Sequence, residues 1–214
     1  MKRITFAIFA TLLLMASTSF AVTSATNASS VSPTLSVSAT VQKAVRLTLA
    51  VGATGGVSHC AVAAGGGTDY AMDFGTVDAL AIANGNCNKF APTTAGVSDA
   101  IYWSDYSLTP VFTSHTTASN TTITAQVTTD FAAPNNLYVV RDNSNSNAAA
   151  VATPAGPGSF VAISTGSADT IGAAGLANGT AITRFIGVGV KPLNANNVVY
   201  TQQTATVTFT LTVQ

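Results

Sequence analysis

The amino-acid sequence predicts an all-β protein whose strands form an antiparallel sandwich. Two segments, residues 35–51 and 204–214, alternate apolar and polar side chains for most of their length. A period of two places one face of an extended chain against apolar surface and the other against water. Thr, Val, Gly, Asn and Ser are common, whereas the helix formers Glu, Gln, Lys and Arg are scarce, which favours strands and turns over helices. We therefore expect about eight to ten short strands with turns between them, and no long helix.

The first residues have the pattern of a secretory signal peptide. A short basic start precedes an apolar stretch over residues 4–15, and small residues lie before a cleavage point after Ala21. The apolar stretch is shorter than the roughly 20 residues that span a bilayer. We therefore expect residues 1–21 to be cleaved rather than kept as a membrane anchor, so that the exported mature chain has no membrane span.

Charge is sparse in the mature chain, which has six basic residues, eight Asp and no Glu, a net charge of −2. So little charge gives weak electrostatic attraction to nucleic acid or to anionic membranes, and we expect no nucleic-acid partner. The length fits one all-β domain. We expect this domain at residues 52–214, after an N-terminal extension at residues 22–51.

The alternating segment at residues 35–51 is long for one strand of a small sandwich. At roughly 3.3 Å per residue it spans about 55 Å when extended, whereas most strands have about 3–10 residues. The excess suggests that part of the segment pairs outside its own domain, as a strand given to a neighbouring copy would. The alternative is that the segment bends near Lys43 and forms two strands of one complete sandwich.

Shorter segments farther along the chain have strand-like patterns bounded by turn residues. We expect strands near residues 70–75, 100–110, 121–131, 136–141, 159–163 and 180–190. The C-terminal strand has the clearest pattern, because Thr occupies every even position from 204 to 212 and an apolar residue every odd position from 205 to 213. Its predicted inward face consists of Ala205, Val207, Phe209, Leu211 and Val213.

The chain has two cysteines, Cys60 and Cys87. In an exported protein they are expected to form a disulfide, because the compartment is oxidising. Closing a loop of this size stabilises the fold by about 3–4 kcal/mol in the chain-entropy model. A metal site is the weaker interpretation, because His59 lies beside Cys60 but no second pair of ligands has zinc-like spacing.

Taken together, the leader, the alternating extension, the early Cys pair and the alternating last strand resemble subunits of bacterial chaperone–usher pili. The likeness is to the archaic branch, which shares the spore coat protein U-like domain. It is carried by residues 45–50 ahead of Cys60, by Asp73-Phe74-Gly75-Thr76, and by residues 204–214. The sequence departs from the pattern in its Gly-rich insertion before Cys60, and in Val213, where classical pilins commonly have Tyr.

The resemblance implies an incomplete immunoglobulin-like sandwich that lacks one strand and therefore has an apolar groove. In such a family a periplasmic chaperone fills the groove first, and the N-terminal extension of the next subunit fills it in the filament, with assembly at an outer-membrane usher. Strand addition combines backbone hydrogen bonds with alternate side chains docked in pockets. The implied donor residues are Leu35, Val37, Ala39 and Val41, with Val45, Leu47 and Leu49 as a second register.

We therefore expect a structural subunit of a homopolymeric filament that passes through the periplasm to the cell surface or the medium, and that serves in adhesion or biofilm formation. The alternative is a self-contained secreted sandwich that binds carbohydrate or a surface protein. For that alternative, Tyr102, Trp103 and Tyr106 are the candidate sugar platform, although aromatic residues in an alternating strand more often pack in a core.

Few residues suggest catalysis or a bound metal, and we expect no enzyme activity and no cofactor. The chain has two histidines, His59 and His115, and none of the common nucleophile, phosphate-binding or zinc-protease motifs. A calcium site from Asp69, Asp73 and Asp78 is a minor alternative, because their spacing does not match an EF-hand.

Overall fold

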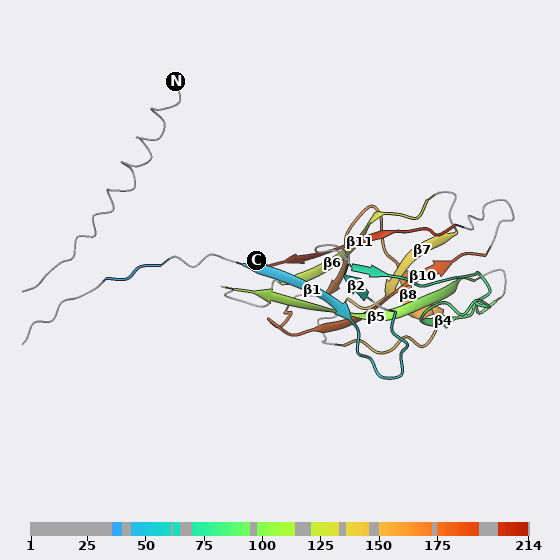
Figure 1. The fold of residues 1–214 in the computed structure, drawn as a ribbon, viewed down its shortest axis with the longest axis horizontal. Helices are drawn as coiled ribbons and strands as arrows, with labels where there is room; N and C mark the ends of the chain where they lie inside the picture. The colour runs from blue at the N-terminus through green and yellow to red at the C-terminus, as the bar shows by residue number, and fades with distance from the viewer. Residues whose placement is uncertain are drawn as a thin grey trace, which may run out of the picture. The chain divides into compact units, whose positions relative to one another are not determined.

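The computed structural model describes residues 36–39, 44–60, 62–64, 70–94, 98–113, 121–132, 136–145, 150–172, 175–192 and 201–213. The chain divides into two units, Met1–Gln42 and Lys43–Gln214. In the first unit, residues 36–39 have no regular secondary structure, and the predicted leader lies outside the described residues. The second unit is the sandwich (Figure 1). It begins before the predicted boundary at Gly52, because the strand that ends at Val51 belongs to it.

The larger sheet of the sandwich is wholly antiparallel. Its strands in spatial order are β1 (Val45–Val51), β5 (Ala100–Phe112), β10 (Ile182–Val190), β7 (Leu137–Asp142) and β8 (Phe160–Ala162). A sixth strand, β4 (Asn88–Phe90), pairs with the first residues of β5, whereas β1 pairs with the last.

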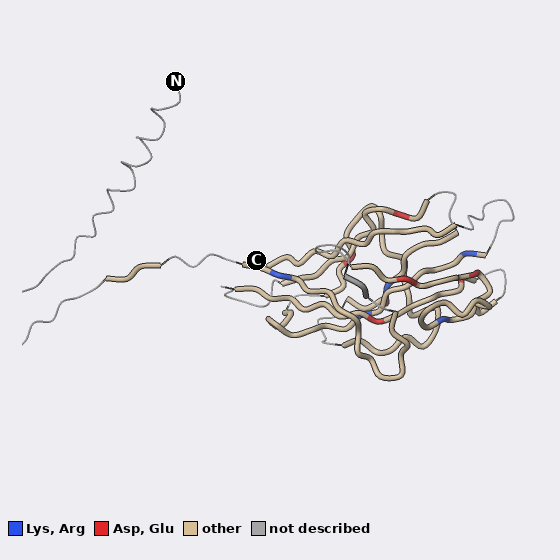
Figure 2. The backbone as a smooth tube through the Cα atoms, viewed as in Figure 1, with Lys and Arg blue, Asp and Glu red and all other residues tan. Residues whose placement is uncertain are grey.

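The smaller sheet is also antiparallel and has the order β11 (Thr206–Thr212), β6 (Thr122–Thr129) and β9 (Asp169–Gly172). A separate two-stranded ribbon joins β2 (Val62–Ala64) to β3 (Tyr70–Met72). The described residues include one 3₁₀ turn, η2 (Pro157–Ser159), and no α-helix. The predicted all-β antiparallel sandwich is thus confirmed. Charged residues are few along the described backbone (Figure 2).

Alternation builds the core between the two sheets. Ile123, Ala125 and Val127 of β6 point inward and are 0%, 1% and 4% exposed. They pack in one cluster with buried residues of the facing sheet, among them Leu108 and Ile182. Each inward position on β6 is followed by a Thr or Gln that is half-buried or exposed, as a strand with one face in water requires.

The middle of the larger sheet is buried on both faces. On its outer face Trp103 stacks on Phe90 with ring centroids 5.4 Å apart, and meets Phe185 edge-on at 5.5 Å. Tyr106, on the other face, belongs to the core between the sheets. Because both faces are covered, residues 100–106 of β5 are all buried, and this strand lacks the alternation that marks the outer strands.

Two predicted strands have different ends in the structure. β3 ends at Met72 because the Asp73 carboxylate accepts a hydrogen bond from the Gly75 N–H at 2.8 Å, and Gly75 has a φ of +72°, which starts a turn. β5 continues past Pro110 to Phe112. Proline is tolerated there because Pro110 lies beyond Leu108, the last residue of β5 that pairs with β10, so its missing N–H removes no bond between these strands. Its carbonyl accepts a hydrogen bond from the Gly179 N–H at 2.8 Å.

Candidate functional site

Two edge strands of the sandwich lie side by side, and we call the strip between them the seam. β1 is the last strand of the larger sheet and β11 the last strand of the smaller one, and the two lie close together. Neither has a strand partner on its outer edge among the described residues. An edge of this kind presents unpaired backbone N–H and C=O groups that can template another strand.

The inward face of β11 is less buried than that of its neighbour. Val207 lies opposite Val127, and Leu211 opposite Ile123. The two residues of β6 are 4% and 0% exposed, whereas Val207 and Leu211 are only half-buried although they pack on the same core. Phe209 between them is also half-buried, with its ring centroid 5.4 Å from that of Tyr106.

The inward side chains of the facing strand β1 are also incompletely buried. Leu49 lies opposite Leu108, which is fully buried, but Leu49 itself is half-buried, as is Leu47. At the two ends of the strand the exposure is greater, 59% for Val45 and 41% for Val51. The seam is therefore lined on both sides by apolar side chains that the described chain covers incompletely.

The opposite side of the sandwich is closed by the chain itself. The segment from β8 to β9 crosses between the sheets, with the Ile163 N–H donating to the Val139 carbonyl at 3.0 Å and the Val127 N–H donating to the Ser164 carbonyl at 3.1 Å. Ile163 and Ile171 there are 6% and 2% exposed. On this side the connecting segment is buried in the core, whereas β1 and β11 contribute a run of half-buried apolar residues, Leu47, Leu49, Val207, Phe209 and Leu211.

The predicted donor residues fall in different places. Val37 and Ala39 belong to the described residues without regular structure, and Val37 is 82% exposed. Leu35 and Val41 lie outside the described residues. Val45, Leu47 and Leu49 are part of β1, which pairs with β5 of the same chain along its whole length. These three residues already have a place in their own domain, so the second donor register does not fit this structure.

The predicted C-terminal face agrees with the register of β11. Val207, Phe209 and Leu211 occupy the inward positions of the strand, and Ala205 and Val213 lie half-buried just beyond its two ends. Sequence reasoning identified this face but not its role, because the alternation of β11 is that of any strand with one buried face.

The disulfide between Cys60 and Cys87 is confirmed, with 5.3 Å between the two Cα atoms. It joins the segment after β1 to the residue just before β4. The Cys60 N–H also donates to the hydroxyl of Ser104 on β5 at 2.9 Å. The bond is compatible with a protein exported to an oxidising compartment.

His59 pairs with a buried carboxylate. Its Nδ1 lies 2.5 Å from Oδ1 of Asp105, whose side chain is fully buried and whose Oδ2 accepts the Thr54 N–H at 2.9 Å. The neighbouring hydroxyl of Ser104 is occupied by Cys60 and by the Asp105 carbonyl. Within the described part of the chain, no three His, Cys, Asp or Glu side chains gather as metal ligands would.

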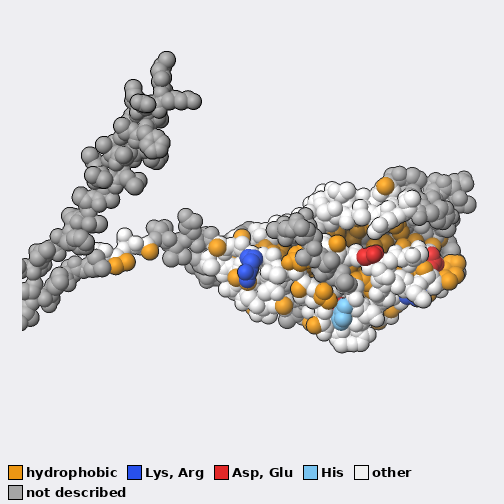
Figure 3. Space-filling model, viewed as in Figure 1, with side chains coloured by type: hydrophobic (Ala, Val, Ile, Leu, Met, Phe, Trp, Pro, Cys, Tyr) orange, Lys and Arg blue, Asp and Glu red, His pale blue; other side chains and the backbone are white. Residues whose placement is uncertain are grey.

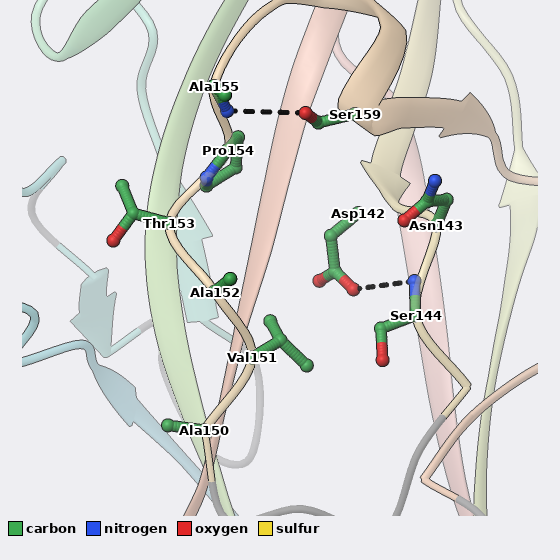
Figure 4. Close-up of a pocket in the computed structure, with 10 residues that line it drawn as sticks. All are labelled: Asp142, Asn143, Ser144, Ala150, Val151, Ala152, Thr153, Pro154, Ala155 and Ser159. Atoms are coloured by element: carbon green, nitrogen blue, oxygen red, sulfur yellow. Dashed lines mark hydrogen bonds between the residues drawn. The ribbon is translucent and has the colours of Figure 1, made fainter.

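A hollow, shown in Figure 4, lies between residues 142–144 and 150–155. The Asp142 carboxylate borders it and accepts hydrogen bonds from the N–H groups of Ser144 at 3.0 Å and Phe185 at 2.8 Å. Burial raises the pKa of Asp142, against the opposing effect of these two hydrogen bonds and of Arg184 and Arg141. The described side chains that line the hollow include no second titratable group, so they form no acid–base pair.

The candidate sugar platform is buried. Tyr102, Trp103 and Tyr106 are 1%, 5% and 2% exposed and belong to three different clusters of the core. A sugar stacks only on an exposed ring face, so these three residues do not form the sugar platform that the self-contained binding module would need. Of the calcium candidates, Asp69 lies outside the described residues, and Asp73 and Asp78 bind backbone N–H groups of their own turns.

No helix in the described part of the chain is long and apolar enough to cross a membrane. Compared with known protein families, curated proteins and solved structures, the chain matches none of them.

Proposed function

We propose that the protein is the structural subunit of a homopolymeric surface filament, in which the N-terminal segment of one copy is inserted as a strand into the seam of the next. One observation supports this most directly: the inward apolar residues of β1 and β11 are half-buried, whereas those of β5 and β6 next to them are fully buried. A single added strand would cover the half-buried side chains of both β1 and β11.

The N-terminal segment has the chemistry that the seam requires. Its odd positions from Leu35 to Val41 are apolar and its even positions are Ser and Thr. Inserted along β11, it would direct four apolar side chains inward and pair its backbone with the open edge. Fully burying a Val or Leu is worth about 1.5–3 kcal/mol, so several such residues and the backbone ladder would make dissociation very slow.

The same edge explains why a subunit would need protection before assembly. An open strand edge beside exposed apolar side chains promotes uncontrolled pairing. A periplasmic chaperone that occupies the seam, and an outer-membrane usher that exchanges it for the next subunit, are the partners that the resemblance to chaperone–usher pilins implies. Adhesion or biofilm formation would then be a property of the filament.

The test uses two neighbouring substitutions in the donor segment. Val37→Asp places a charge on its inward face, and Ser38→Asp places the same charge on its outward face. We expect the chain from Val22 with Val37→Asp to form no SDS-resistant ladders, whereas the Ser38→Asp chain forms ladders that collapse only on boiling. The donor-defective Val37→Asp chain should still bind an added synthetic peptide of residues 32–42 in an SDS-resistant one-to-one complex.

The peptide gives the matched control. A peptide with the Ser38→Asp change should bind like the original, and one with Val37→Asp should not. Ladders from the Val37→Asp chain equal to those of the unchanged chain would contradict the proposal, as would a stable unchanged monomer that takes up no peptide. The second result would favour a self-contained module.

A further inference from the structure

A tightly held loop at one end of the sandwich exposes two large apolar side chains. This end loop comprises residues 78–83, between β3 and β4. Ala81 packs there with Ala100 and Val190, at the start of β5 and the end of β10. Val45 lies beside Phe112 at the other end of β5. The end loop and the start of β1 are therefore at opposite ends of the domain (Figure 1).

The end loop is held rigidly by one carboxylate. Asp78 accepts hydrogen bonds from the N–H groups of Leu80 at 2.7 Å, Ile82 at 3.2 Å and Ala83 at 2.5 Å. The ammonium group of Lys89 donates to the Ala83 carbonyl at 2.8 Å. Hydrogen bonds thus hold both N–H groups and a carbonyl group of the loop backbone.

This rigid backbone presents apolar surface to solvent. Leu80 is 49% exposed and Ile82 is 75% exposed, with the buried Ala81 between them at a φ of +55°. A non-glycine residue in this left-handed region is strained. The strain and the three hydrogen bonds to Asp78 together keep both large side chains turned outward. Figure 3 shows hydrophobic side chains gathered at the surface at this end of the sandwich.

The direction of strand insertion brings another copy to this end. In Figure 1, β11 runs toward the end of the domain where β1 begins. A strand that pairs with β11 in the antiparallel sense would run the other way, with its last residue, Val41, directed toward the end loop. From Val41 the chain continues for four residues to Val45, a reach of at most about 14 Å.

We propose that the end loop is the docking surface for the next copy of this chain, with Leu80 and Ile82 covering the exposed Val45 at the start of the neighbour's β1. Docking of this kind rests on the proposed strand insertion. It adds a second contact at each junction, one that fixes the angle between successive sandwiches, because a short linker alone would leave that angle free.

The test places one cysteine on each side of the predicted contact. The chain with Ile82→Cys and Val45→Cys should form covalent oligomers when assembled material is oxidised and then boiled in SDS without reductant. The control chain carries Val161→Cys with Val45→Cys, because Val161 lies on β8 and is also exposed, at 39%. It should return to monomer on boiling.

The two proposals fail in different ways. SDS-resistant ladders before boiling, together with no more covalent oligomer from the Ile82→Cys chain than from the Val161→Cys chain, would overturn the docking surface and leave strand insertion standing. An unchanged parent chain that forms no ladders at all would overturn both.

Discussion

At the scale of single residues, short polar side chains determine where the chain turns. The Asp78 carboxylate accepts hydrogen bonds from three backbone N–H groups, and the phenol of Tyr102 donates a fourth at 3.2 Å. Burial alone would raise the pKa of Asp78, but the N–H groups of Ala83, Leu80 and Ile82 outweigh it and hold the pKa below the ordinary value. The same pair affects the phenol, because burial and the nearby carboxylate raise the pKa of Tyr102 to about 12.

The lowered pKa predicts that the end loop loosens in acid. A carboxyl group whose pKa is lower in the folded state stabilises the fold above its unfolded pKa of about 3.9, and the effect is lost as the pH falls through the folded value. We expect the hydrogen-exchange protection of the Leu80 and Ala83 amides to fall as the pH drops below about 4, while the Ala125 amide in β6 stays protected. Asp78→Asn should remove most of this dependence. Protection of Leu80 that is constant over the range would contradict it.

Two glycines of β10 are required by the atoms that pack next to them. A Cβ on Gly187 of β10 would lie 2.3 Å from the Tyr102 carbonyl oxygen, and one on Gly189 would lie 2.2 Å from the Tyr138 ring. Both glycines lie in a segment with the alternating pattern of a strand, and that pattern does not account for them. The close packing against β5 and β7 explains why neither position has a side chain.

At the scale of elements, the seam depends on the register of β11. Leu211 and Thr210 are adjacent, but one faces the core and the other faces solvent. The pairing of Leu211 with Ile123 and of Thr210 with Thr124 fixes these directions, and a slip of one residue would exchange them.

This register predicts opposite results for two substitutions in the same strand. Leu211→Lys should stop filament assembly, because a charge at a half-buried inward position must be desolvated when a donor strand covers it. Thr210→Lys should leave assembly unchanged, within about 0.5 kcal/mol of stability for an exposed site. SDS-resistant ladders and the urea midpoint of each chain provide the measurement. Equal assembly by the two chains would show that nothing covers the inward face of β11.

At the scale of the whole molecule, the chain buries one side of its sandwich more completely than the other. The crossing from β8 to β9 buries Ile163 and Ile171, and no described segment does the same between β1 and β11. The disulfide stabilises the domain by about 3–4 kcal/mol in the chain-entropy model, but it joins the loop after β1 to the residue before β4 and does not cover the seam.

Supplying the missing strand within one chain should therefore complete the fold. We expect a chain without residues 22–42, carrying residues 32–42 after Gln214 through a short flexible linker, to be a monomer that forms no ladders. Its free energy of unfolding should exceed that of the chain without the added segment by several kcal/mol, at about 1.5–3 kcal/mol for each apolar side chain buried. Denaturation in guanidinium chloride measures this difference. A control with Val37→Asp in the added segment should lose most of it, and equal stability of all three chains would contradict the open seam.

Much of the fold was predictable because alternation records which residues face a core. The inward face of β11, the strand character of residues 45–51 and the Cys60–Cys87 pair all follow from local pattern or from the chemistry of thiols in an oxidising compartment. The predicted role of Trp103 as core rather than ligand platform also agrees with its burial among Phe90, Phe160 and Phe185.

The sequence by itself determined that this is an antiparallel β protein with a half-buried strand near each end. Only the tertiary structure decided that residues 45–51 pair with β5 of their own chain and that β1 and β11 lie side by side as the edge strands of the two sheets. The reason is physical: backbone hydrogen bonds between strands are the same for every partner, so a period of two shows that one face is covered but not by which strand.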